Sequence, residues 1–165
     1  MIRTAAVEDV EALIELIHGL ARYERSPESV KISAQQLHEA LFGEAATVHA
    51  HVAEEDGRVV GMAIWFLTFS TWTGHHGIYL EDLYVREDVR GRGVGRALLT
   101  ELAAVAVRSG YSRIDWSVLT WNEPALAFYL SLGARPQDEW IGYRLTEDTL
   151  PKLVQRPDSA VPPPA

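Results

Sequence analysis

The sequence predicts an α/β (α+β) protein in which helices flank a mixed, largely antiparallel twisted sheet. Three observations carry this prediction: an amphipathic helix pattern near the start, a β-hairpin signal after it, and a later strand that leads through a glycine-rich turn into a second amphipathic helix. The chain has 165 residues, about the length of one domain. We therefore expect one domain over residues 1–150 and a Pro-rich, flexible tail over residues 151–165.

The first half of the chain carries both helix and hairpin signals. Apolar residues recur at three- and four-residue spacing from Val10 to Ala21, which is typical of a helix with one buried face. Ser33 stands where a second helix needs a cap, and the Glu-Asp-Gly sequence at residues 55–57 is typical of a tight hairpin turn. The expected elements are a strand at 1–3, helices at 10–22 and 33–42, and strands at 47–54 and 58–69.

The second half alternates strands and helices. A strand, a helix and a further strand in that order predict a parallel strand pair joined by a right-handed crossover. Asn122 is a suitable cap for the last long helix, and Pro124 is tolerated in its first turn. The expected elements are a strand at 78–85, a helix at 94–109, a strand at 113–119, a helix at 122–132 and a strand at 142–145.

Composition excludes several classes of protein. The chain has no cysteine, which excludes disulfides, thiolate metal sites and a cysteine nucleophile, and suits a reducing cytoplasm. With 15 basic and 23 acidic side chains the net charge is −8, which disfavours nucleic acid as a partner and favours a cationic or neutral small molecule. The sequence shows no signal peptide and no apolar stretch of about 18 residues, so we expect a cytoplasmic protein without a membrane partner.

The glycine-rich turn before the 94–109 helix is the strongest chemical signal. Gly91, Gly93 and Gly95 let successive backbone amides converge at a helix N-terminus, which favours an anion such as phosphate. The pattern is neither a P-loop nor a dinucleotide-binding fingerprint. The alternative is a solvated arginine cluster, but the position between a strand and an amphipathic helix favours phosphate. The nearby arginines are Arg86, Arg90, Arg92 and Arg96.

Several segments of the chain together resemble a known family. They are Leu80-Glu81-Asp82-Leu83-Tyr84-Val85, Arg90-Gly91-Arg92-Gly93-Val94-Gly95, Trp121-Asn122-Glu123-Pro124-Ala125 and Phe128-Tyr129. On these residues, and on similarity over about residues 2–150, the chain resembles the GNAT superfamily of acetyl-CoA-dependent N-acetyltransferases. Within it, the chain is similar to the diamine (spermidine/spermine) and thialysine acetyltransferases. The resemblance implies a sheet splayed between the strands at 78–85 and 113–119, acetyl-CoA as co-substrate, no metal, and a homodimer.

The resemblance also implies which residues hold acetyl-CoA. The backbone of Leu83, Tyr84 and Val85 would bind the pantetheine, Asn122 would lie beside the cofactor, and Tyr129 near its sulfur. Independently, the seven-residue spacing places Asn122 and Tyr129 on one helix face, and a phenol is protonated at pH 7, as a general acid must be. The alternative for Tyr129 is core packing. The residues that would hold the pyrophosphate are Arg90, Gly91, Arg92, Gly93, Val94, Gly95 and Arg96.

The resemblance places the amine acceptor beside a group of acidic and aromatic residues. Glu81 would contact the amine and relay its proton, and Asp82 would attract the cation. Because the family has a bulge in this strand, side chains there need not alternate regularly. The alternatives are a surface acidic pair and loop packing. The other residues implied at the amine site are Tyr23, Glu24 and Trp72.

The chain departs from polyamine-specific members of the family at two positions. Ser70 and Ile141 stand where those members carry acidic residues, so a short amine or lysine analogue competes with a long polyamine. Other open alternatives are a protein N-terminus or an antibiotic as acceptor, and a non-catalytic acyl-CoA-binding domain. His49-x-His51 would place two imidazoles on one strand face, but without a third ligand a metal site is disfavoured.

Overall fold

The computed structural model describes residues 1–155 and divides the chain into two compact units, residues 1–117 and residues from 118 on. The first unit contains a five-stranded sheet with the order β1-β2-β3-β4-β5. Its elements are β1 (Ile2–Thr4), η1 (Val7–Asp9), α1 (Val10–Tyr23), η2 (Pro27–Ser29), α2 (Ala34–Phe42), β2 (Val48–Glu55), β3 (Arg58–Ser70), β4 (His75–Val85), η3 (Glu87–Val89), α3 (Val94–Ser109) and β5 (Ile114–Asp115). The second unit contains α4 (Glu123–Ser131) and α5 (Leu150–Val154).

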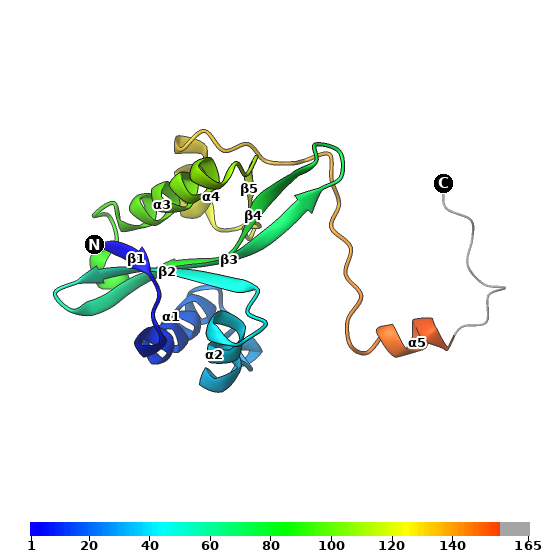
Figure 1. Cartoon of the computed structure of the whole chain (residues 1–165), viewed down its shortest axis with the longest axis horizontal. Helices are drawn as coiled ribbons and strands as arrows, with labels where there is room; N and C mark the ends of the chain where they lie inside the picture. Colours follow the sequence, from blue (N-terminus) through cyan, green and yellow to red (C-terminus); the bar gives the residue numbers. More distant parts are fainter. Residues whose placement is uncertain (156–165) are drawn as a thin grey trace. The chain divides into compact units, whose positions relative to one another are not determined.

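The sheet is mixed and mostly antiparallel, as predicted. Strands β1 to β4 pair antiparallel in sequence order, and β5 pairs parallel to β4. Helices α1 and α2 cover one face and α3 covers the other (Figure 1). Leu13 of α1 packs in one buried cluster with Met62 and Ile64 of β3, and Leu98 of α3 is fully buried on the opposite face. Apolar side chains on both faces of the central strands therefore anchor the helices.

The local signals of the first half are confirmed. The side chain of Ser33 caps α2 by accepting a hydrogen bond of 3.2 Å from the backbone N–H of Gln36. Asp56 and Gly57 have φ values of 51° and 75°, the left-handed conformation that a two-residue hairpin turn requires at both positions. These residues join β2 to β3 directly and thereby set the register of the central sheet.

A β-bulge interrupts β4 at Glu81. Asp82 lies opposite Ile64 and Leu80 lies opposite Trp65, so Glu81 has no residue opposite it on β3. A bulge of one residue reverses the alternation of side chains beyond it. Asp82 consequently shares a face with Ile64, which belongs to the cluster beneath α1. The bulge therefore turns Asp82 toward the side of the sheet that α1 covers.

Two predicted strands differ from the structure. The strand expected at 113–119 is reduced to Ile114–Asp115, which pair only with Ile78 and Tyr79 of β4. The strand expected at 142–145 does not form, and these residues are exposed. A strand needs a hydrogen-bonded neighbour, so β-forming composition alone was insufficient. Within residues 1–117, no strand pairs with residues 80–85 on the side away from β3, which is the opening that a splayed sheet requires.

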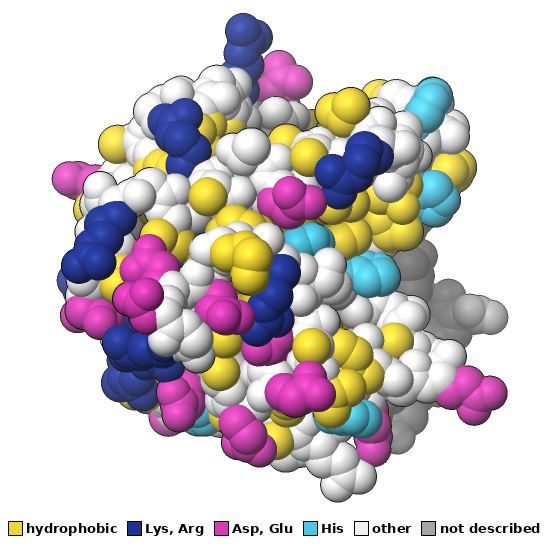
Figure 2. Space-filling view, turned by 60° about the vertical axis from the view of Figure 1, so that its left-hand side comes forward, with side chains coloured by type: hydrophobic (Ala, Val, Ile, Leu, Met, Phe, Trp, Pro, Cys, Tyr) yellow, Lys and Arg dark blue, Asp and Glu magenta, His cyan; other side chains and the backbone are white. Residues whose placement is uncertain are grey.

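The tail expected at residues 151–165 begins within α5, and its residues 156–165 lie outside the described part of the chain. Over residues 1–155, no helix is both long and apolar enough to span a membrane. On the face shown in Figure 2, basic side chains lie among acidic ones.

Candidate active site

The glycine-rich turn forms the N-terminus of α3. Gly91 and Gly93 have φ values of 78° and 84°, and Gly93 is the N-cap, with no side chain capping the helix. The first helical backbone hydrogen bond runs from the N–H of Ala97 to the carbonyl of Gly93. The N–H groups of residues 94–96 therefore have no acceptor within the helix and point out of its end. Such an end, with its positive helix dipole, suits a phosphate group.

The four arginines of this segment do not act as one group. Arg86 is turned toward α1, where it forms a 2.7 Å ion pair with Glu15 and donates to the carbonyl of Val59. Arg92 donates to the carbonyl of Asp88. Within the described residues, the side chain of Arg96 has no hydrogen bond or ion pair. The positive charge beside the glycine turn thus comes from Arg90, Arg92 and Arg96, and the sequence grouping of Arg86 with them was wrong.

Arg90 is held against the end of the sheet by three contacts. Its Nε donates a 3.0 Å hydrogen bond to the carbonyl of Val85. Its guanidinium carbon lies 4.6 Å from the ring centre of Tyr23 and 5.3 Å from that of Tyr84, within cation–π range of both. These contacts were not predicted from the sequence. A signal was present in Gly19, since a glycine inside an amphipathic helix often marks a close approach.

The backbone of β4 is open beside the glycine turn. The N–H of Arg86 donates to the carbonyl of Val60, so the peptide groups of alternate residues in β4 point toward β3. Those of Leu83 and Val85 point the other way, to the side where β5 has ended. The Val85 carbonyl accepts from Arg90, and the peptide groups of Leu83 remain directed toward the opening. This is the strand edge that the resemblance assigned to pantetheine.

Three of the predicted acidic residues come together in the first unit. Burial, together with the smaller effects of the neighbouring charges of Glu81 and Glu24, raises the pKa of Asp82 to about 6. Burial also raises the pKa of Glu24, which follows the last residue of α1. Asp82 at the open stretch of β4 thus interacts electrostatically with both Glu81 and Glu24, and a cationic group nearby would stabilise their charge. We call Glu24, Glu81 and Asp82 the carboxyl cluster.

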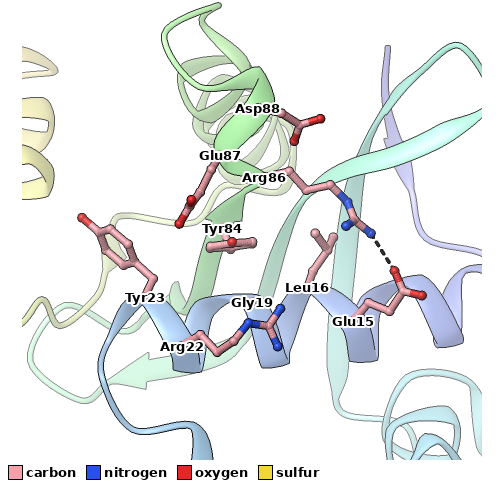
Figure 3. A pocket seen from close by; sticks show the side chains of 9 residues that line it. All are labelled: Glu15, Leu16, Gly19, Arg22, Tyr23, Tyr84, Arg86, Glu87 and Asp88. Carbon is pink, nitrogen blue, oxygen red and sulfur yellow. Dashed lines mark hydrogen bonds and ion pairs between the residues drawn. The ribbon is translucent and has the colours of Figure 1, made fainter.

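A cavity of about 380 Å³ lies between α1 and the end of β4 (Figure 3). In Figure 3, Tyr84 lies between Tyr23 on one side and the Arg86–Glu15 ion pair on the other. The two rings that contact Arg90 therefore also form a wall of this cavity. Its lining residues are Glu15, Leu16, Gly19, Arg22, Tyr23, Tyr84, Arg86, Glu87 and Asp88.

The structure does not bring Trp72 to the carboxyl cluster of the same chain. Trp72 is 89% exposed in the turn between β3 and β4. Six residue steps along β3 separate the last pair of this hairpin, Ser70 with His75, from the pair of Ile64 with Asp82. At about 3.3 Å per residue this is about 20 Å. Within one chain, Trp72 thus does not contact the carboxyl cluster, as its predicted role at the amine site would require.

Asn122 and Tyr129 belong to the second unit. Asn122 is the N-cap of α4, as predicted, and its side-chain oxygen accepts a 3.3 Å hydrogen bond from the N–H of Ala125. The ring of Tyr129 lies 5.3 Å from that of Phe128, between ring centres. Asn122 thus has a structural role at the helix start, and the roles of both residues toward acetyl-CoA stay predictions.

The histidine pair on β2 is engaged with an aromatic ring. The Nε1 of Trp65 donates to Nδ1 of His51, and the ring of His49 lies 4.4 Å from that of Trp65, between ring centres. Over residues 1–155, no group of three or more potential metal ligands occurs. The pair therefore has a packing explanation.

Comparison with known proteins identifies the family. The sequence pattern of the Acetyltransferase (GNAT) family matches residues 10–134. The chain belongs to the GNAT family of acetyltransferases. The matched region contains all of α1, the carboxyl cluster, the glycine turn and α4.

Individual GNAT relatives cover nearly the whole chain. Thialysine N-epsilon-acetyltransferase from Bos taurus is 36% identical over 93% of this chain and 96% of its own length, and that from Sus scrofa is 35% identical over the same shares. Among solved structures, an integron cassette protein from the mobile metagenome of V. cholerae aligns with a TM-score of 0.79 and 29% identity, covering 94% of this chain and 98% of that one. The GNAT fold inferred from the sequence is thereby confirmed.

Proposed function

We propose that this GNAT enzyme transfers an acetyl group from acetyl-CoA to a primary amine of a small cationic molecule, by direct attack within a ternary complex. The observation that carries the proposal is the carboxyl cluster beside an unpaired stretch of β4 that leads into the glycine turn. The positive end of α3 would bind the negatively charged pyrophosphate of an acyl carrier. The carboxyl cluster would bind a cationic acceptor.

The glycine turn and the β4 edge supply the proposed acetyl-CoA site. The free N–H groups at the start of α3 and the side chains of Arg92 and Arg96 would receive the pyrophosphate. The outward peptide groups of Leu83 and the N–H of Val85 would pair with the amide groups of pantetheine, as a neighbouring strand would. Asn122 and Tyr129 stay predicted contacts of acetyl-CoA.

The carboxyl cluster supports a cationic acceptor. An alkylammonium would stabilise the ionised form of Asp82, whose pKa is raised by burial first and by the charges of Glu81 and Glu24 second. Ser70 stands where polyamine-specific enzymes carry an acid, and the two relatives described above are named for thialysine. We therefore favour a lysine-like amine or short diamine over a long polyamine. Tyr23 and Trp72 stay predicted contacts of this acceptor.

The proposed reaction balances with the groups present. The amine must lose a proton, because a lysine-like amine with a pKa near 10.4 is an ammonium at neutral pH. Asp82 or Glu81, directly or through a water molecule, would accept that proton as the N–C bond forms. The C–S bond then breaks, and the Tyr129 hydroxyl would donate a proton to the departing thiolate. The nitrogen would lose its second proton as it becomes an amide, and this proton, passed through water, would restore the Tyr129 hydroxyl. The products are an N-acetylamine and CoA.

Thiol release from acetyl-CoA tests the proposal directly. Purified protein is assayed with thialysine, lysine, putrescine, spermidine and an aminoglycoside separately, and each product is identified by mass. Turnover with thialysine, lysine or putrescine, reduced by Tyr129→Phe and by Glu81→Gln, is the expected result. Turnover with the aminoglycoside alone would contradict the acceptor class. CoA binding without turnover on any amine would favour a non-catalytic acyl-CoA-binding domain.

We also propose that the enzyme is a homodimer. Several large apolar side chains of the segment after α4 are exposed in the single chain, at 57–93%. Burying such side chains against a second copy would be favourable. Sedimentation analysis should therefore show a dimer, and replacing two of these residues by serine should shift it to monomer. The exposed residues are Trp140, Ile141, Tyr143 and Leu145.

A further inference from the structure

We propose that Tyr23 and Tyr84 are positioning residues for Arg90, and that through this arginine they set the affinity of the glycine turn for acetyl-CoA. The inference rests on the proposed function. It differs from the sequence-based prediction, in which Tyr23 serves the amine.

Arg90 is the last residue before the turn adopts its left-handed conformations. Gly91 follows it directly with a φ of 78°, and Gly93 caps α3 two residues later. Glycines allow a turn many conformations. A ligand that binds only one of these conformations loses binding free energy, because the turn must give up conformational entropy. Fixing the side chain of Arg90 restricts the start of the turn and lowers that cost.

The contacts of Arg90 come from two elements that are distant in sequence. Val85 and Tyr84 belong to the end of β4, and Tyr23 is the last residue of α1. The hydrogen bond of 3.0 Å to the Val85 carbonyl orients the guanidinium, and the two rings limit where it can lie. Arg90 is thereby fixed to the main body of the sheet and to α1, not only to its own loop.

Gly19 determines where the Tyr84 ring can lie. A Cβ at Gly19 would be 2.8 Å from Cε1 and 2.9 Å from the hydroxyl oxygen of Tyr84, closer than van der Waals contact permits. The ring is buried, with 8% of the residue exposed. A glycine in the third turn of α1 thus lets the ring pack directly on the helix backbone. The position of α1 thereby determines where the Tyr84 ring lies and, through the ring, where Arg90 lies.

The end of α1 contacts both halves of the proposed site. Tyr23 contacts Arg90 of the cofactor turn, and the next residue, Glu24, belongs to the carboxyl cluster. Replacing Tyr23 should therefore raise the KM for acetyl-CoA more than the KM for the amine. Replacing a residue that bound only the amine would instead raise the KM for the amine more.

The test measures CoA binding by calorimetry, together with the KM for acetyl-CoA and for the amine. Tyr23→Leu and Tyr84→Leu should each weaken CoA binding about three- to tenfold, the range expected for loss of a cation–π contact. Tyr23→Phe and Tyr84→Phe should recover most of that loss because the ring is retained. The matched control is Arg108→Ala, which removes an exposed arginine from the opposite end of α3 and should leave CoA binding unchanged.

A double-variant cycle separates positioning from independent binding. If the rings act through Arg90, Arg90→Ala combined with Tyr84→Leu should bind CoA no more weakly than Arg90→Ala alone. Additive losses would overturn the inference, as would wild-type affinity in both leucine variants. Gly19→Ala provides a variant that retains every side chain of the site, and its added Cβ should weaken CoA binding by displacing the Tyr84 ring.

The outcomes distinguish this inference from the proposed function. If the wild-type protein fails to bind CoA, the proposed function is wrong and the inference falls with it. If the wild type binds CoA and the variants bind it equally well, only the inference is wrong. Where Tyr84→Leu lowers the melting temperature, Tyr23→Leu decides, because Tyr23 is only half-buried and lies at a helix end.

Discussion

The indole N–H of Trp65 on β3 donates a 3.1 Å hydrogen bond to Nδ1 of His51 on β2. Both residues are buried, with 6% of each exposed. Because Nδ1 accepts this bond, the imidazole must be neutral, with its proton on Nε2. Protonating His51 would place a second hydrogen opposite the indole N–H and would charge a buried ring.

This bond predicts that the protein loses stability in mild acid. Burial lowers the pKa of His51 below its usual 6.5. Below about pH 6.5, His51 is therefore protonated in the unfolded chain but still neutral in the folded chain. The free energy of unfolding should fall as the pH drops through this range. Urea unfolding between pH 8 and pH 5 measures this effect. His51→Leu should flatten the dependence, and the exposed His75→Gln should not; equal slopes in all three proteins would contradict the assignment.

Asp82 predicts a stability change of the opposite sign. Its pKa in the folded protein is about 6, against an ordinary value of 3.8, so the folded state holds this proton more strongly than the unfolded state. Its contribution therefore favours folding below about pH 4 and is lost as the pH rises through 6. Asp82→Asn should raise the free energy of unfolding at pH 8 by about 1 to 3 kcal/mol. The gain should disappear at pH 4, and the exposed Asp138→Asn should show none.

The same carboxyl group predicts the acid limb of the activity profile. If ionised Asp82 attracts the amine and accepts its proton, kcat/KM for the amine should fall as the pH drops through about 6. Measured rates from pH 5 to pH 8 should show this inflection in the wild type. Asp82→Asn should lower the rate at pH 8 and remove the inflection. An unchanged inflection in that variant would assign it to another group.

Local features of this fold, and the parallel pairing of β4 with β5, were predictable from residue patterns, whereas the position of the bulge and the length of β5 were not. Ser33 capping α2 and Gly57 turning a hairpin depend only on neighbouring residues, so the sequence patterns located them. The bulge at Glu81 depends on how β3 and β4 align, and the shortness of β5 depends on the absence of a neighbouring strand beyond Asp115. Local propensity does not encode either of these.

The site shows the same division. The glycine turn was predicted from glycine spacing, and the acidic residues Glu24, Glu81 and Asp82 were predicted from the resemblance to the family. The contact of Arg90 with Tyr23 was not, because it joins the end of α1 to a turn that lies far along the chain. Tertiary packing alone creates that contact.

Two of the left-handed glycines, Gly93 and Gly57, predict a separation between stability and binding. Their φ values are 84° and 75°, and a Cβ at either position would meet no atom within 4 Å. Gly93→Ala and Gly57→Ala should therefore each cost about 1 to 2 kcal/mol of stability through backbone conformation alone. Chemical denaturation measures this cost.

Only one of these substitutions should affect acetyl-CoA. Gly93 directs the free N–H groups at the start of α3, whereas Gly57 turns the hairpin between β2 and β3. Gly93→Ala should thus weaken CoA binding at least about tenfold, since the loss of even one charge-assisted hydrogen bond costs about 1.5 kcal/mol or more. Gly57→Ala controls for the loss of stability and should bind CoA as the wild type does. Equal affinity in both variants would mean that the pyrophosphate does not bind at this helix end.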